Sequence, residues 1–253
     1  MAVKKKDNEV DESKAVELSI VIPIYNEEGI LSASVADLVS KMDADPRLSH
    51  RTYELILSEN GSSDETVAIA KGLMKRLPQL RLLHSDEPNY GLAMRRGILD
   101  ACGEIVLCDE IDLCDTDFYA RALEKIEDEG YDLVVGSKAL DRSMDQRPLY
   151  RQAATRVLNG MFRILLGFHG TDTHGLKAFR RDRLLSVVDR CVVDKDLFAS
   201  EFVIRTERMD FRMTEIPVHI VEKRKPSINL FKRVPHVLKS MGRLVWVIRV
   251  TNR

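Results

Sequence analysis

Residues 18–25, LSIVIPIY, form a continuous apolar run, as a strand buried on both faces requires. A helical pattern follows over residues 30–42, with its apolar side chains on one face. The next predicted strand, 53–58, ends in the turn ENGSSDE, where Ser62 and Glu65 have the spacing of a capping box for a second helix. The first third of the chain therefore predicts strand, helix, strand and helix in alternation.

The alternation continues through the middle of the chain. Further strands are predicted at 80–85, 104–109 and 132–137, with a third helix over about 90–101. After about Gly136 the rhythm loosens into long helical stretches around a strand-like segment, at 149–167, 231–250 and 212–220. This pattern predicts an α/β fold with a mainly parallel sheet, flanking helices and a C-terminal amphipathic helix.

The composition points to a cytoplasmic protein without a membrane span. The 253 residues include no apolar run near the roughly 20 residues that span a bilayer. The first residues are charged and lack a signal-peptide core, and the four cysteines form no CxxC pair, so we expect reduced thiols. We expect three parts: a disordered tail (1–16), one domain (17–222) and a basic segment (223–253).

The basic segment differs from the rest of the chain in charge. Residues 1–222 carry a formal charge of −10, whereas residues 223–253 carry +9, with nine Lys and Arg and no acidic residue. Val237, Met241, Leu244 and Ile248 fall on one helical face, and Trp246 adds an aromatic anchor. Such a helix either lies on an anionic membrane surface or packs on the sheet with its basic side in water. We favour the membrane.

Acidic residues gather where the fourth predicted strand ends. Asp109, Glu110 and Asp112 are carboxylates that repel one another unless a divalent cation neutralises them. The alternative is a solvated acidic turn in which Asp115 only caps the next helix.

Five motifs occur in an order that resembles the family-2 glycosyltransferases of the GT-A (Rossmann-like) fold. They are LSIVIPIYNEE, ENGSSDET, NYGLAMRRGILDACGEIVLCDEID, VVGSK and DTHGLKAFRRD. The later motifs, with EIPVHIVEKR, resemble those of the polyprenyl (dolichyl)-phosphate mannose and glucose synthases. The resemblance implies a nucleotide-diphosphate sugar as donor, GDP- or UDP-linked, Mg²⁺ or Mn²⁺ as cofactor, and a polyprenyl phosphate as acceptor.

The resemblance also implies which residues hold the nucleotide sugar. They are Pro23, Tyr25, Glu27, Glu59, Asn60, Asn89, Arg95 and Glu110. Glu59 and Asn60 stand where the family usually has two aspartates, the second of which accepts hydrogen bonds from the base. The Asn60 amide can still accept such a bond, but it carries no charge and can also donate.

The metal site implied by the resemblance departs from the family pattern. Glu110 and Asp112 fall on the two usual aspartates, and Asp109 is an extra carboxylate, so the expected ligands are Asp109, Glu110 and Asp112. Cys114, which follows, is a poor ligand for a hard cation.

Basic residues that match the family are expected to gather the acceptor phosphate. These are Lys138, Arg147, Arg151 and Arg224, and the expected catalytic residues are Asp112, Asp172 and Arg151. Asp172 could orient the sugar or acceptor, serve as base toward a hydroxyl acceptor, or only hold its turn. Arg156 is more simply a solvated side chain on a helix.

We therefore expect an inverting, metal-dependent hexosyl transfer to a polyprenyl phosphate at the cytoplasmic membrane face. One alternative is a transferase that uses a hydroxyl acceptor of a glycan or small molecule. Another is a catalytically silent nucleotide-binding module, for which the Glu59-Asn60 pair and the altered acidic motif argue. A nucleic-acid partner is not expected, because the aromatic spacing for base stacking is missing. The sequence predicts no oligomeric state.

Overall fold

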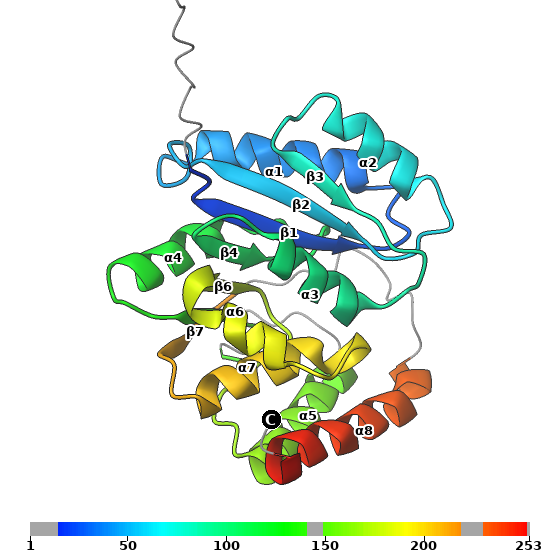
Figure 1. The fold of residues 1–253 in the computed structure, drawn as a ribbon, viewed down its shortest axis with the longest axis vertical. Coiled ribbons are helices and arrows are strands. Elements are labelled where there is room, and N and C mark those ends of the chain that lie inside the picture. The colour runs from blue at the N-terminus through cyan, green and yellow to red at the C-terminus, as the bar shows by residue number, and fades with distance from the viewer. Residues whose placement is uncertain (1–14, 141–148, 219–229, 252–253) are drawn as a thin grey trace, which may run out of the picture.

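Seven strands form one sheet in the order β3-β2-β1-β4-β6-β5-β7 in the computed structural model, which describes residues 15–140, 149–218 and 230–251 (Figure 1). The strands are β1 Leu18–Ile24, β2 Tyr53–Glu59, β3 Leu80–Leu83, β4 Ile105–Cys108, β5 Leu133–Ser137, β6 Lys177–Arg180 and β7 Met213–Pro217. β1 runs parallel to both β2 and β4. The α/β class and the mainly parallel sheet are thus confirmed.

The strand β6 was not predicted, and it changes the topology. It lies antiparallel between β4 and β5, with Lys177 opposite Cys108 on one side and Val135 on the other. β4 and β5, which are neighbours in the predicted alternation, are therefore separated by a strand from later in the chain.

Helices cover both faces of the sheet, over two hydrophobic clusters (Figure 1). Ile20 and Ile22 of β1 belong to one cluster and Val21 to the other, which explains the unbroken apolar run of this strand. The first cluster includes α1 Leu31–Ala44, α2 Thr66–Met74 and α4 Thr116–Glu127. The second includes α3 Tyr90–Asp100, α5 Leu149–Leu166, α6 Arg181–Arg190, α7 Phe198–Arg208 and α8 Leu230–Trp246.

Short helical turns complete the second layer. A 3-10 turn, Lys195–Leu197, precedes α7, and a π-helical turn, Val247–Thr251, follows α8. Within the described parts of the chain, no helix combines the length and the apolar character needed to cross a bilayer. The predicted disordered tail lies almost wholly outside the described residues.

The predicted capping box is wrong. The helix α2 begins at Thr66, and its N-cap residue Glu65 makes no side-chain cap hydrogen bond. Ser62 instead donates its backbone N–H to a carboxylate oxygen of Glu59, and its hydroxyl accepts from the N–H of Asn26. The Ser-x-x-Glu spacing is therefore used to join loops rather than to start a helix.

Candidate functional site

The loops after β1 and β2 are locked together at the carboxyl edge of the sheet. The Asn26 side chain accepts from the N–H of Ser63 at 2.8 Å, in exchange for the bond to Ser62. Two further hydrogen bonds join the same loops. The backbone N–H of Glu28 donates to the Asp64 carboxylate at 3.2 Å, and the backbone N–H of Glu65 donates to the Glu28 carboxylate at 3.0 Å. Asn26 adopts a left-handed backbone conformation (φ 53°), which asparagine tolerates well. The polar residues of both motifs thus build one rigid rim.

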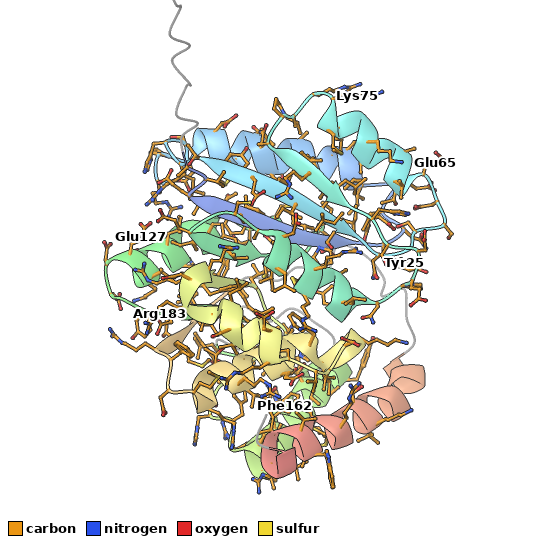
Figure 2. All side chains as sticks on the ribbon, in the orientation of Figure 1. Tyr25, Glu65, Lys75, Glu127, Phe162 and Arg183 are labelled. Atoms are coloured by element: carbon orange, nitrogen blue, oxygen red, sulfur yellow. The ribbon has the colours of Figure 1, made fainter. Side chains whose placement is uncertain are left out.

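The predicted nucleoside contacts of β1 lie on this rim. Pro23 is opposite Ser58 of β2. The pairing of β1 with β4 ends at Val21, so the missing N–H of Pro23 costs no hydrogen bond between β1 and β4. Tyr25 is 45% exposed, and Figure 2 shows it with Glu65 at the edge where β1 and β2 end. The backbone N–H of Glu27 donates to the hydroxyl of Thr66 at 2.7 Å. Tyr25 therefore offers an open aromatic face beside the rim.

The Glu59 carboxylate is engaged inside the protein. It is fully buried, and it accepts from the Ser62 N–H and from Nδ1 of His84 at 2.5 Å. Burial alone would raise the pKa of Glu59, but these hydrogen bonds lower it below its ordinary value. Arg96 donates to the carbonyl oxygens of both Glu59 and His84, at 2.9 and 3.0 Å. Glu59 therefore ties the ends of β2 and β3 together, a role that the sequence did not predict.

The third helix opens at the predicted turn. Asn89 is its N-cap, and its side chain accepts from the N–H of Leu92 at 3.0 Å. Asn60 accepts, through Oδ1, the backbone N–H of Asn89. Arg95 lies elsewhere: its guanidinium donates to the carbonyl oxygen of Asp189, at the end of α6, at 3.1 Å. The expected contact of Arg95 with a diphosphate is therefore not supported.

In the acidic loop, Asp109 is a structural carboxylate rather than an open ligand. It is 1% exposed and accepts from the hydroxyl of Tyr119 at 2.5 Å and from the N–H groups of Glu110 and Asp115 at 2.6 and 3.0 Å. Burial raises its pKa to about 7, against the opposing effect of these hydrogen bonds. Both carboxylate oxygens of Asp109 therefore already accept hydrogen bonds from the protein, and its role as a metal ligand stays a prediction.

Two carboxylates of the loop remain open. Glu110 is exposed and Asp112 is half-buried, while Cys114 is buried. The surrounding protein desolvates Glu110 enough to raise its pKa, although the residue is exposed. Asp115 caps α4 by accepting the N–H of Phe118 at 2.9 Å, as the alternative interpretation of the loop expected.

The open pair suits a hard cation only with help from a ligand. Carboxylate oxygens are what Mg²⁺ and Mn²⁺ prefer, and such cations commonly keep further positions for phosphate oxygens and water. No group of three His, Cys, Asp or Glu side chains in the described segments is arranged to hold a metal. Glu110 and Asp112 therefore fit a cation that a diphosphate brings with it, rather than a closed protein cage.

Two lysines and one carboxylate lie near enough to Glu110 to act on it electrostatically. Lys138 follows β5 and lies with its Nζ 3.9 Å from Oδ2 of Asp172. Burial alone would raise the pKa of Asp172, but Lys138 and the N–H of His174 lower it below its ordinary value. Lys177, in β6, is 4% exposed and donates to the carbonyl oxygen of Gly175 at 2.7 Å. Both lysines act electrostatically on Glu110, so the three motifs converge on one site.

The turn that carries Asp172 is fixed by its neighbours. Glu215 of β7 accepts from the N–H groups of Thr171 and Asp172 at 2.7 and 3.2 Å. Gly175 passes so close to β5 that a Cβ there would lie 1.8 Å from the carbonyl oxygen of Gly136. Glycine is required at this position, which explains its place in DTHG.

Two residues near the acidic loop were not predicted from the sequence. Lys177 was not singled out, because a lone basic residue in KAFR has no signature of burial. Tyr90 is 38% exposed, and the charges of Glu110, Asp109 and Asp112 add to burial in raising its pKa, which places its ring beside the acidic loop. In the sequence, the position of Tyr90 directly after the N-cap Asn89 was the only indication that it lies at the site.

Several residues predicted to bind the acceptor phosphate lie outside the described part of the structure. Arg147 and Arg224 lie outside the described residues, and Arg151 belongs to α5 without a described side chain. Arg156 is exposed and donates to Gln152 at 3.2 Å, in line with a solvated helix face. Of the predicted acceptor residues, Lys138 is the one whose side chain is seen at the site.

The basic C-terminal helix uses much of its apolar face internally. Met241, Leu244 and Ile248 are buried in the second cluster, whereas Leu238 and Trp246 are 53% and 60% exposed. Lys239 and Arg243 are exposed. The helix therefore packs on the domain, as one of the two alternatives expected, and still presents apolar and basic side chains to solvent.

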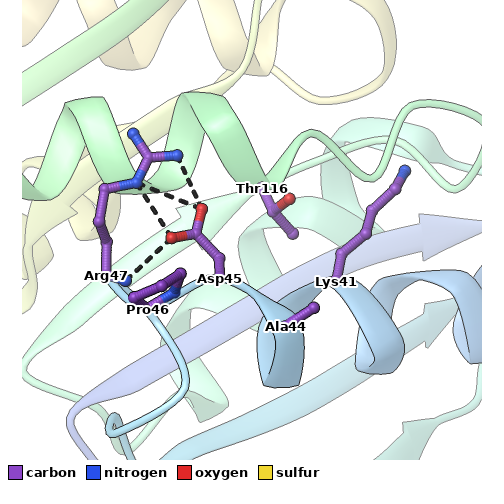
Figure 3. Close-up of a pocket in the computed structure, with 6 residues that line it drawn as sticks. All are labelled: Lys41, Ala44, Asp45, Pro46, Arg47 and Thr116. Atoms are coloured by element: carbon purple, nitrogen blue, oxygen red, sulfur yellow. Dashed lines mark hydrogen bonds and ion pairs between the residues drawn. The ribbon is translucent and has the colours of Figure 1, made fainter.

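A separate hollow between the last turn of α1 and the first turn of α4 is lined partly by charged side chains (Figure 3). Arg47 and Asp45 form an ion pair there at 2.7 Å, and Lys41 lies nearby. The hollow lies at the opposite end of α1 from the rim, and its charges largely neutralise each other. We assign it no role.

Comparison with known proteins agrees with this geometry. The model of Glycosyl transferase family 2 matches residues 19–187. Glycosyltransferase AglD of Haloferax volcanii is 29% identical over 94% of this chain and 38% of its own length. The undecaprenyl-phosphate 4-deoxy-4-formamido-L-arabinose transferase of Yersinia enterocolitica is 29% identical over 84% of this chain and 62% of its own length. The chain therefore spans less than two thirds of either relative.

A solved structure shares the fold. Glucosyl-3-phosphoglycerate synthase from Mycobacterium tuberculosis, in complex with Mn²⁺, uridine diphosphate and phosphoglyceric acid, superposes with a TM-score of 0.60 at 20% identity. The match covers 91% of this chain and 78% of that one. The fold is thus of the GT-A type.

Proposed function

Because the chain belongs to glycosyl transferase family 2, we propose that it moves a hexose from a nucleotide-diphosphate sugar to a polyprenyl phosphate, with inversion at the anomeric carbon. One observation carries the proposal. The open carboxylates Glu110 and Asp112 lie near the lysines Lys138 and Lys177, so the site holds charges of both signs where two phosphate groups must meet.

On the donor side, the chain supplies a rim and an acidic pair. Tyr25 lies open beside the two joined loops and offers a face for the base of a GDP- or UDP-linked sugar. Glu110 and Asp112 would hold Mg²⁺ or Mn²⁺, which supplies positive charge for the departing diphosphate. Asp112 then has the catalytic role, and Glu110 contacts the donor through the same ion.

On the acceptor side, the low basicity of Asp172 argues for a phosphate over a hydroxyl. Its pKa is lowered, so it is ionised at neutral pH and is a weak base. A hydroxyl acceptor needs a base, whereas a phosphate acceptor is already anionic and needs cations. Lys138 supplies one such cation, and Arg147, Arg151 and Arg224 are proposed to supply others.

The acceptor lipid places the enzyme at the cytoplasmic membrane face, as a peripheral protein. Leu238 and Trp246 are exposed on α8 beside the basic residues Lys239 and Arg243. An amphipathic surface with this charge binds anionic bilayers. The name of the Yersinia relative, with undecaprenyl phosphate in it, supports the same class of acceptor.

The test is release of nucleoside diphosphate by purified protein. We expect release only when Mg²⁺ or Mn²⁺, a nucleotide sugar and a polyprenyl phosphate are all present. Release at the same rate without the lipid phosphate would contradict the acceptor, and release in excess chelator would contradict the metal.

A second candidate keeps the donor and uses a hydroxyl acceptor. It is favoured by the phosphoglyceric acid in the structural relative from Mycobacterium tuberculosis. Asp172→Asn separates the two, because a phosphate acceptor tolerates loss of the carboxylate far better than a hydroxyl that needs a base. If the folded protein binds no nucleoside diphosphate with Mn²⁺ in calorimetry, the silent binding module is favoured instead.

A further inference from the structure

The side-chain amide of Asn60 has a fixed direction. Asn60 is 6% exposed, and its Oδ1 accepts the backbone N–H of Asn89. That N–H is itself held in place, because Oδ1 of Asn89 accepts from the N–H groups of Leu92 and Lys195 at 3.0 and 2.9 Å. Of the two amide atoms of Asn60, only the oxygen can accept from a backbone N–H, so the nitrogen must face the other way.

At the end of β2, Oδ1 of Asn60 therefore faces the Asn89 N–H, and Nδ2 is left with donors to offer. Within the part of the chain that the structure describes, nothing accepts a hydrogen bond from Nδ2 of Asn60, and this nitrogen is not fully enclosed. The neighbouring carboxylate of Glu59 is fully buried and already accepts from Ser62 and His84. A ligand at this edge meets the N–H groups of Asn60.

We infer that Asn60 contacts the nucleobase as a hydrogen-bond donor, which reverses the polarity of a carboxylate at this place. The inference rests on the proposed function. Uracil and cytosine both carry a carbonyl oxygen at position 2 and differ at ring atom N3, which is a donor in uracil and an acceptor in cytosine. A carboxylate here selects uracil through its N3–H. Asn60 makes no such selection.

The substrate class that follows is a nucleotide sugar whose base offers an acceptor at this edge, whether uridine- or cytidine-linked. Guanine has a carbonyl oxygen at position 6, so the contact also admits guanosine nucleotides. Sites built to pair with one hydrogen-bonding pattern reject the opposite pattern strongly, and sites without that pairing discriminate weakly.

The test compares UDP with CDP by calorimetry in the presence of Mn²⁺. For the natural chain we expect dissociation constants within about threefold of each other. Asn60→Asp should prefer UDP by about tenfold or more, because one carboxylate oxygen keeps the Asn89 N–H and the other accepts from uracil N3–H but repels cytosine N3. The carboxylate lies near the first turn of α3, where the helix dipole favours negative charge, so the variant should fold.

Gln79→Glu is the matched control. It adds the same charge just before β3, at the end of the strand away from the loops of the site, and should leave the ratio of the two affinities unchanged. Asn60→Ala should weaken both nucleotides alike.

Two results would overturn the inference alone: a tenfold UDP preference in the natural chain, or an unchanged ratio in Asn60→Asp that circular dichroism shows to be folded. If Asn60→Asp does not fold, the ratio in the natural chain decides. Failure of the folded natural chain to bind either nucleotide would contradict the proposed function as well.

Discussion

The ammonium group of Lys138 lies 3.9 Å from Oδ2 of Asp172, near enough for an ion pair and too far for a strong hydrogen bond. The backbone N–H of Lys138 reaches the same oxygen at 3.4 Å. Both side chains are largely withdrawn from solvent, at 15% and 2% exposure, so water screens their attraction only in part. The lysine can therefore offset the charge of Asp172 and still turn N–H donors toward a second anion.

Replacing this lysine should impair transfer. We expect Lys138→Met to lower turnover with a polyprenyl phosphate by about 100-fold, the cost typical of removing one preorganised charge from a transition state. Lys138→Arg, which keeps the charge, should lose less. Initial rates with saturating donor measure the effect, and Lys75→Met, at the exposed C-cap position of α2, is the control. Equal rates for Lys138→Met and the natural chain would show that Lys138 has no role in the transfer.

The open carboxylates of the acidic loop should account for metal dependence. Glu110→Gln and Asp112→Asn each remove one ligand. We expect the factor by which Mn²⁺ increases nucleotide affinity to be about tenfold smaller in either variant than in the natural chain. Calorimetry with and without Mn²⁺ measures this. Asp115→Asn removes a charge from the same loop but keeps the helix cap, because asparagine caps as well as aspartate. If all three variants behave alike, the loss reflects loop charge rather than coordination.

The buried carboxylate of Asp109 should matter for stability. Tyr119→Phe removes the hydroxyl that donates to it at 2.5 Å, and we expect the free energy of unfolding to fall by about 1–3 kcal/mol. Urea denaturation measures the change. Tyr150→Phe, at an exposed position of α5, should change it by less than about 0.5 kcal/mol. A neutral Tyr119→Phe would mean that Asp109 does not need this bond.

Glu54 should make stability depend on pH. Burial alone would raise its pKa, but bonds from Ser19, Cys102 and Arg81 lower it below the model-peptide value of 4.5. A lowered pKa in the folded state means that the stabilisation is present above pH 4.5 and is lost as the pH falls through the folded value. Glu54→Gln should therefore cost about 1–3 kcal/mol at pH 7 and less at pH 3.5. Unfolding curves at both pH values measure it, and an equal cost at both would contradict the assignment.

The exposed basic side of α8 should govern binding to vesicles. Each Lys or Arg near an anionic surface contributes about 1 kcal/mol, so Lys239→Glu with Arg243→Glu should weaken binding to phosphatidylserine-containing vesicles by about 30-fold or more. Co-sedimentation measures this. Lys75→Glu with Arg76→Glu, directly after α2, reverses as much charge on the other face of the sheet, where Figure 2 labels Lys75. Similar losses in both double variants would indicate a general charge effect and no docking by α8.

The strands of the first half could be predicted because each one carries its own signal. β1, β2 and β4 are apolar runs that end in polar turns, and this pattern does not depend on distant residues. The short β6 has only four residues, two of them basic, so no local periodicity identifies it. It becomes a strand because β4 and β5 each leave an edge that it can pair with.

In the site, sequence identified which residues gather but not which of them are enclosed. Asp109 and Glu110 are adjacent carboxylates, and the bonds that Asp109 accepts from Tyr119 and from the N–H of Asp115 distinguish the buried structural group from the open one. Similarly, the direction of the Asn60 amide depends on Asn89, 29 residues away. The apolar face of α8 was visible as a pattern, but its partner, the second cluster, was not.

The place of β6 between β4 and β5 has a consequence for synthesis on the ribosome. Strands β1 to β4 can pair with one another as soon as residue 108 has emerged. β5 cannot join them, because its two neighbours in the sheet, β6 and β7, are translated 40 residues and more after it. The nascent chain therefore holds a finished half-sheet whose β4 edge is unpaired for the time that this stretch takes to be made, and a truncation before Lys177 would leave the β4 edge unpaired permanently.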